Sequence, residues 1–323
     1  MKFNEGIFNS IIREIDRALS KQGVELNSRP IRAATIIAEH YIVSVDGKSV
    51  EKDKFYDEAW FAGIYRDVHA WFEGKYGDLN YSNEDGRHAL LMHAGIFRVV
   101  LIPKTIVKRK SDKTIEITFP DHLHEGEDYL SWISPKIDAA KISNSEANRL
   151  NIRVASLCKK IRSIAIFSNY AQGNEKEMVR SVPDHLEQAA LVAGKRKNKS
   201  LAIWELHLAV EKCLKFLIYQ SGANYPKTHD LTDLCRLLIG SKELAFFKLV
   251  ENIPGAKEVI DHRYMKAKIV SDLEFYGKYK TVLKICMEAG SLFKRDYVLN
   301  NASFVLGKPP WFSQMDIKDS SKE

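Results

Sequence analysis

The segment that most constrains the fold is residues 200–220, where apolar side chains recur at helical spacing. One stripe of this predicted helix carries Ile203, Leu206, Val210, Leu214 and Leu217. Three further small or apolar residues widen the stripe, namely Ala202, Ala209 and Phe216. A helix with so wide an apolar arc must be covered on more than one side. The chain is therefore expected to build a helical bundle around it.

Polar residues in and after this helix follow a second pattern. His207, Glu211 and Lys215 are spaced at i, i+4 and i+8, and a glutamate four residues before a lysine is the favourable order for an ion pair. The stretch from 222 to 226, which begins with glycine and ends with proline, breaks the helix. Thr228 can then cap the next helix, with Asp230 in its first turn, where the helix dipole favours a negative charge.

These residues resemble the core of the HEPN domain. The resemblance rests on Ala202, Ala209, Glu211, Lys212, Leu214 and Lys215, followed by a glycine turn and the run Lys227, Thr228, His229, Asp230 and Leu231. Arg263 and Tyr264 stand where HEPN proteins often carry an Arg-Tyr pair before their last long helix. We expect that helix at about 271–297, with Leu273, Tyr276, Tyr279, Leu283 and Cys286 facing inward. The resemblance covers roughly 182–300.

The resemblance implies an antiparallel helical bundle that forms a homodimer. Some HEPN proteins are ribonucleases that use an Arg-x(4–6)-His motif near the last helices, whereas others are binding or scaffold units in toxin–antitoxin, antiphage and nucleotidyltransferase-associated systems. No such motif falls within 182–300. The predicted function is thus a non-catalytic module that binds RNA, a nucleotide or a protein partner in a defence or toxin–antitoxin setting. The alternative is a metal-independent HEPN ribonuclease.

Three residues of the HEPN-like part are candidates for a site, His229, Arg263 and Tyr264. An arginine beside a tyrosine near a helix end offers a forked donor and a stacking face for phosphate or a base. In the structural alternative, Tyr264 packs under the last helix and Arg263 pairs with an acid such as Asp261 or Glu274. The structural alternative for His229 is a bond to backbone at a helix start.

The first 175 residues predict an α+β domain. Amphipathic helices are expected at 5–22, 31–43 and 54–74, and short strands at 96–102, 104–110 and 114–119, with a hairpin turn at 110–113. A long helix at 144–167 ends this part. Its apolar seam consists of Leu150, Val154, Leu157, Ile161 and Ile164. The predicted fold is mainly α with a small antiparallel sheet, organised as an N-terminal domain over 1–175, a HEPN-like bundle over 176–302 and a loose tail over 303–323, anchored by Trp311.

The net charge of +7, with an isoelectric point near 9.0, favours anionic partners such as nucleic acid. Two basic segments are the candidates for phosphate contact. One is the break at Lys195, Arg196 and Lys197, and the other is the outer face of the long helix at Lys159, Lys160 and Arg162. Such contacts are sensitive to salt and do not read sequence. The alternative is an ordinary solvated surface.

Other motifs carry weaker signals. Arg87 and His93 match the Arg-x(4–6)-His spacing outside the HEPN-like part. The stretch 46–49 ends like a phosphate-binding loop, but Ile42 stands where the first glycine is required. A contiguous polar loop holds His122, His124, Glu125, Glu127 and Asp128. It reads as a solvated turn rather than a metal site, and no metal or cofactor is predicted.

The cysteines and the N-terminus bear on the compartment. Cys158, Cys213, Cys235 and Cys286 lie far apart among apolar residues, which favours free buried thiols in a reducing environment. The N-terminus shows no signal-peptide pattern, and no stretch is apolar enough for a membrane span. We therefore expect a cytoplasmic location.

Overall fold

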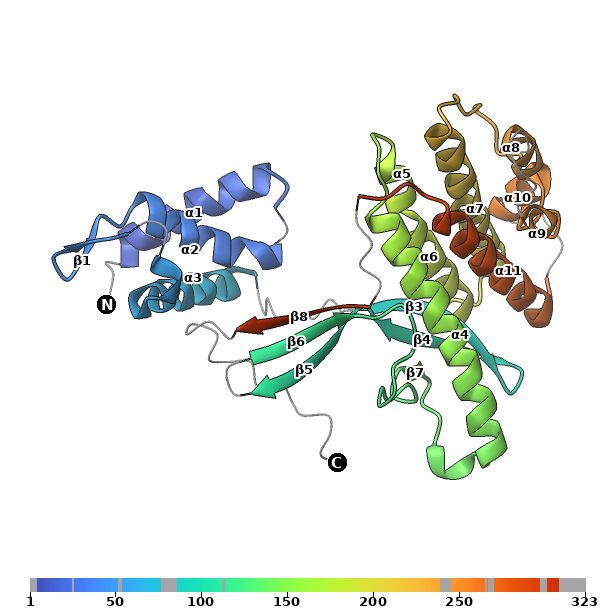
Figure 1. The fold of residues 1–323 in the computed structure, drawn as a ribbon, viewed down its shortest axis with the longest axis horizontal. Helices are drawn as coiled ribbons and strands as arrows, with labels where there is room; N and C mark the ends of the chain where they lie inside the picture. Colours follow the sequence, from blue (N-terminus) through green and yellow to red (C-terminus); the bar gives the residue numbers. More distant parts are fainter. Residues whose placement is uncertain are drawn as a thin grey trace. The chain divides into compact units, whose positions relative to one another are not determined.

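The computed structural model describes residues 5–24, 26–51, 54–76, 86–111, 114–238, 245–264, 266, 270–296 and 301–307. It confirms a mainly helical chain with small antiparallel sheets (Figure 1). The chain divides into two compact units. Unit 1 comprises 1–83, 107–117 and 304–323, and unit 2 comprises 84–106 and 118–303. Among the described residues, no helix has the length and apolar character needed to cross a membrane.

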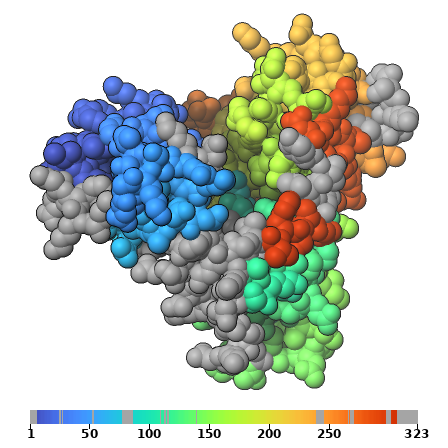
Figure 2. Space-filling view, turned by 60° about the vertical axis from the view of Figure 1, so that its left-hand side comes forward, coloured from blue at the N-terminus to red at the C-terminus, as the bar shows by residue number. Residues whose placement is uncertain are grey.

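Three helices make the core of unit 1. They are α1 (Glu5–Lys21), α2 (Arg29–His40) and α3 (Ala59–Tyr76), close to the predicted ranges, and their surface is blue in Figure 2. The side chains of Ile12, Ala33 and Phe61 are fully buried in this small core. One carboxylate, that of Asp16, is buried beside it. Lys75, Tyr76 and Arg29 donate hydrogen bonds to Asp16 at 2.7, 2.6 and 3.1 Å, which satisfies the buried charge.

Short strands complete unit 1. β1 (Ser44–Val45) and β2 (Lys48–Ser49) form a hairpin whose turn residues, Asp46 and Gly47, both have positive φ, at 50° and 76°. Asp-Gly is a preferred pair for such a turn, so the stretch 46–49 is a hairpin and not a phosphate loop. β5 (Ile106–Ser111), β6 (Thr114–Phe119) and β8 (Ala302–Gly307) form a three-stranded sheet in that order. Most of its residues belong to unit 1, whereas Ile106, Thr118, Phe119, Ala302 and Ser303 belong to unit 2.

β8 corrects the predicted loose tail, because residues 302–307 pair in a sheet. The rest of that tail, including Trp311, lies outside the described residues, as do positions 112 and 113 of the predicted hairpin turn. The predicted neighbours over 104–110 and 114–119 are confirmed as β5 and β6.

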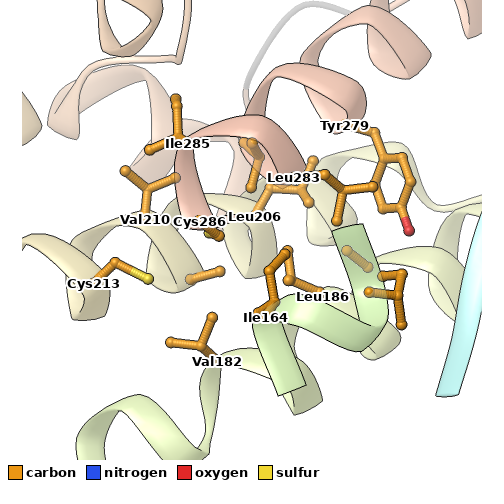
Figure 3. Packing of buried hydrophobic residues seen from close by; sticks show 14 of the residues in the cluster. Ile164, Val182, Leu186, Leu206, Val210, Cys213, Tyr279, Leu283, Ile285 and Cys286 are labelled. Atoms are coloured by element: carbon orange, nitrogen blue, oxygen red, sulfur yellow. The ribbon is translucent and has the colours of Figure 1, made fainter. Parts of the chain in front are cut away.

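Unit 2 is built on four helices around one core. They are α4 (Asn144–Asn169), α6 (Val182–Gly194), α7 (Lys199–Gln220) and α11 (Asp272–Ser291). α6 packs on α7, α7 on α11, α11 on α4, and α4 on α6, so the ring of helices is closed. Figure 3 shows side chains of the core pointing toward one another, among them Ile164, Leu186, Leu206 and Leu283.

The predicted boundary after residue 175 falls inside unit 2. The polar stretch that follows α4 suggested this boundary. The apolar seam of α4 is nevertheless buried in the same cluster as the apolar stripe of α7. α4 is therefore a member of the bundle. The short helix α5 (Lys176–Arg180) connects α4 to α6 within this unit.

Smaller helices cover the remaining sides of α7. α8 (Leu231–Leu238) and α10 (Ala256–Arg263) both pack on it, and α9 (Phe247–Val250) packs on α8. This confirms that the wide apolar arc of α7 is covered on more than one side. α8 begins after Asp230, whose side chain accepts hydrogen bonds from the amides of Thr232 and Asp233 at 2.9 and 3.0 Å. Asp230 is thus the cap in place of the predicted Thr228.

The inward face of α11 agrees with the prediction except at its start. Tyr279, Leu283 and Cys286 are buried, whereas the Leu273 side chain is 73% exposed. Leu273 lies on the same helical face as Lys280 and Lys284, seven and eleven residues later, and that face looks outward. The helix ends at Ser291, before the predicted end at 297.

A three-stranded antiparallel sheet packs on α6. Its strands are β3 (Gly86–His93), β4 (Ile96–Pro103) and β7 (Ile133–Ser134), with β4 in the middle. β3 was not predicted as a strand, because Ala89, Leu90 and Leu91 are consecutive buried residues without alternation. The helix approaches the sheet closely at Gly194, where an added Cβ would lie 2.6 Å from Cγ2 of Val99.

Candidate nucleic-acid interface

α4 and α11 bring four lysines together, which we name the lysine face: Lys159, Lys160, Lys280 and Lys284. Partial burial lowers the pKa of the Lys160 ammonium, and the positive charges of Lys280, Lys284 and Lys159 lower it further. Among the described residues, one carboxylate reaches this face, that of Glu288, 3.8 Å from Lys284 Nζ. The face is therefore a concentration of positive charge with little compensation.

The lysine face is continuous with other cationic and aromatic side chains. Lys280 Nζ lies 5.1 Å from the ring centre of Tyr276, within cation–π range. Arg153 lies on the same side of α4 as Lys160, two turns earlier. It donates a hydrogen bond to the carbonyl of Met92 at 3.0 Å and acts electrostatically on Tyr276. Arg153 thus extends the positive surface toward the start of α11.

The predicted basic break is exposed. Lys195, Arg196 and Lys197 follow α6 with solvent-accessible side chains. Lys199, which begins α7, pairs with Asp272 at the start of α11 through a 2.7 Å contact. The basic break therefore lies at the end of the bundle where α11 begins.

Arg162 does not join this surface. Its side chain is 2% exposed and forms two hydrogen bonds with Glu127, at 2.6 and 3.0 Å. It also donates to the carbonyls of Pro103 and His122. At 100° per residue, Arg162 lies about 200° around α4 from Lys160, on the inner side of the helix. The prediction that Arg162 contacts phosphate is therefore wrong, because its charge is buried and paired.

The polar loop after β6 is held by the same pair. Glu127 also accepts a hydrogen bond from the amide of His124 at 2.8 Å, while His122 bonds Asp121 and stacks on His124. In the part of the chain that the structure describes, no group of three potential ligand residues could hold a metal ion.

His229 belongs to a polar network beneath the α7–α8 turn. Its Nδ1 lies 2.9 Å from Oε2 of Glu211, and its carbonyl faces Nε2 of His207 at 2.9 Å. Glu211 also accepts a hydrogen bond from Lys215 at 2.7 Å, which confirms the predicted pair. His207 is fully buried, with Nδ1 3.2 Å from the carbonyl of Pro254. The network joins α7 to the segments before α8 and α10.

Arg263 and Tyr264 lie on the surface at the end of α10. The Arg263 guanidinium stacks 4.7 Å above the ring of Trp204 and 5.8 Å from the ring of Tyr264. Tyr264 is 63% exposed, so the alternative that it packs under the last helix is wrong. The rings hold the arginine without neutralising its charge.

The Arg-x(4–6)-His spacing does not bring Arg87 and His93 together. Both lie on β3, where six residues span roughly 20 Å. Arg87 pairs with Asp184 and Glu187, and His93 lies 2.9 Å from Glu146. Each side chain therefore has a separate ion pair.

A second match to that spacing, Arg180 and His185, begins just before residue 182 and was not recognised from the sequence. Arg180 pairs with Glu177, and His185 Nδ1 lies 2.6 Å from Glu205. Arg180 is the last residue of α5 and lies two residues before the predicted HEPN-like range of 182–300.

Residues 184–269, from the first turn of α6 to the segment after α10, match the family model of the HEPN domain. No curated protein and no solved structure matches the chain. The match lies within the predicted range of 182–300 and includes the Glu211–His229 network. The C-terminal part of this chain therefore contains a HEPN domain.

Proposed function

We propose that this protein is a non-catalytic HEPN-type module that binds RNA through its phosphate backbone, in a defence or toxin–antitoxin setting. The observation that supports this most directly is the lysine face. Ammonium groups held close together repel one another, and a polyanion laid across them relieves that repulsion and releases bound counterions. The exposed basic break and Arg153 offer further contacts at the same end of the bundle as the start of α11.

Lysines act as point charges and do not read base edges, so the proposed binding is independent of sequence. Tyr276 adds no stacking platform, because it is largely buried and Lys280 lies over its ring. Affinity should therefore depend steeply on salt and little on base composition.

The test replaces Lys160, Lys280 and Lys284 together by glutamine and measures binding to fluorescent RNAs of different sequence at several salt concentrations. We expect affinity to fall roughly tenfold or more for every RNA, and the slope of log K against log salt to shrink by about 2 to 3. The matched control changes Lys136, Lys227 and Lys257, three exposed lysines elsewhere in unit 2. It removes the same charge and should change binding little.

If both triple variants lose the same RNA affinity, binding depends only on net charge, and the proposal that the lysine face binds RNA is contradicted. A third variant with alanine at Lys195, Arg196 and Lys197 measures the contribution of the basic break. The same RNAs are incubated with the protein in EDTA to test for cleavage. Cleavage that His185→Ala abolishes would favour the ribonuclease alternative, since Arg180 and His185 carry the spacing of that motif.

A further inference from the structure

The guanidinium of Arg263, the last residue of α10, is held in place by aromatic rings. Its Cζ lies 4.7 Å from the ring centre of Trp204, in the second turn of α7, and 5.8 Å from that of Tyr264. The end of α10 is tied to the start of α7 by His262, whose Nδ1 lies 3.4 Å from Oγ of Ser200. The position of the guanidinium is therefore set by the packing of α10 on α7 before any ligand binds.

The charge of Arg263 has no carboxylate partner among the described residues. Three acids close to it along α10 and α7 are directed elsewhere. Asp261 lies about 200° around α10 from Arg263. Glu258 and Glu205 each face a histidine, at 3.8 and 2.6 Å. An anion that reaches Arg263 thus finds an uncompensated cation.

The donors of Arg263 are suited to an oxyanion. Rings contact a guanidinium through its faces, so its N–H groups stay free around the edge, where they form a fork that binds two oxygens of one phosphate. Lys266 follows with an exposed side chain, and its amide donates a hydrogen bond to the carbonyl of Asp261 at 2.8 Å, which turns the chain at the end of α10. A second positive charge therefore belongs to the same turn.

Tyr264 adds a ring beside the fork. It is 63% exposed, whereas the ring of Trp204 is covered by the guanidinium. Exposed aromatic rings stack on nucleic-acid bases of any kind, because every base has a π-face. A bare phosphate would leave the Tyr264 ring in water, but a nucleotide can place its phosphate on the fork and its base on the ring. The ligand class that uses both features is a nucleotide.

We infer that Arg263 and Tyr264 form a binding site for a nucleoside monophosphate. The phosphate accepts hydrogen bonds from the edge of the Arg263 guanidinium, and the base lies on the face of Tyr264 that is turned away from Arg263. The site is built by α7 and α10, whereas the lysine face is built by α4 and α11. It therefore does not depend on the function proposed for the lysine face.

The ligand class is tested with AMP, inorganic phosphate and adenosine, each titrated into the full chain by calorimetry and NMR. Phosphate offers only the anion and adenosine only the base and sugar. We expect AMP to bind roughly tenfold or more tightly than either, and UMP to bind as well, because stacking does not depend on the identity of the base. Absence of AMP binding would refute the proposal, and AMP binding no tighter than phosphate would overturn the nucleotide class.

Two variants locate the ligand. Arg263→Lys keeps the charge but loses the fork, so it should weaken AMP roughly tenfold or more. Tyr264→Leu should weaken AMP roughly fivefold or more and leave phosphate binding unchanged. The matched control is Arg236→Lys on α8, where the arginine is exposed and pairs with Asp233, and it should leave AMP binding unchanged. Unchanged AMP binding in a folded Arg263→Lys variant, checked by circular dichroism and melting temperature, would overturn the assignment.

A last variant separates this site from the lysine face. Glutamine at Lys160, Lys280 and Lys284 together should leave AMP affinity unchanged, even though the same variant is expected to lose RNA affinity. Loss of AMP binding in that variant would place the nucleotide on the lysine face and contradict a site at Arg263. If RNA binding fails while AMP still depends on Arg263, the function proposed for the lysine face fails and this site stands.

Discussion

Glu211 offers the sharpest test of the polar network in the HEPN domain. Its side chain is 7% exposed and accepts hydrogen bonds from Lys215 at 2.7 Å and His229 at 2.9 Å. Burial alone would raise the pKa of Glu211, but the hydrogen bonds and charges of Lys215 and His229 lower it below its usual value. Glu211→Gln keeps the size and one acceptor but removes the negative charge.

The expected loss of stability in Glu211→Gln follows from these contacts. A hydrogen bond to a charged group is worth about 1.5–3 kcal/mol, and loss of a buried charge partner can cost about 3–5 kcal/mol. Both estimates are reduced here, because the His229 side chain is 53% exposed and can turn to water, and that of Lys215 is partly exposed. We expect Glu211→Gln to lower the free energy of unfolding by about 2–3 kcal/mol. For a unit of this size that corresponds to a melting temperature lower by roughly 4–12 °C.

Urea unfolding followed by circular dichroism measures the effect as a shift in midpoint at constant m value. Glu177→Gln is the matched control, because Glu177 is 72% exposed and makes a surface pair with Arg180 that is worth at most about 1 kcal/mol. If the two variants unfold at the same midpoint, the network does not stabilise the bundle and the reasoning is refuted.

Two further predictions concern stability. Lowering the pH from 7 to 4 should reduce the free energy of unfolding. Burial lowers the pKa of His207 below 6.5, so the unfolded chain binds a proton before the folded chain does and stability falls. The lowered pKa of Glu211 adds a further loss of stability below about pH 4.5. Urea titrations at each pH measure both effects, and Glu211→Gln should remove the second. Gly194→Ala should cost about 1–3 kcal/mol, because the new Cβ would lie 2.6 Å from Val99 Cγ2. Gly277→Ala should stabilise the protein by about 0.5–1 kcal/mol, because Gly277 lies within α11 and no atom lies within 4 Å of the added Cβ. If differential scanning calorimetry shows that both glycine variants raise the melting temperature, or that both lower it, the packing argument is contradicted.

Local sequence patterns were sufficient to predict the helices in which apolar residues recur with a strong period. The stripes of α4 and α7 predicted both helices and their buried residues, and the spacing of Glu211 and Lys215 predicted their ion pair. The HEPN domain could be recognised for the same reason, since its motif lies within α7 and the turn that follows. β3 could not be predicted, because its consecutive buried residues do not alternate with polar ones and so lack the period of two that indicates a strand.

The sequence by itself indicated that elements pack around residues 200–220 on more than one side, because a helix with so wide an apolar arc must be buried. Only the tertiary structure decided which helices close that bundle and where the charges meet. It made α4 the fourth helix, although a polar stretch separates α4 from α6 in the sequence. It joined Lys160 to Lys280 and Lys284 across 120 residues and buried Arg162 against Glu127, because the partner of a charge is set by packing between elements rather than by its neighbours along the chain.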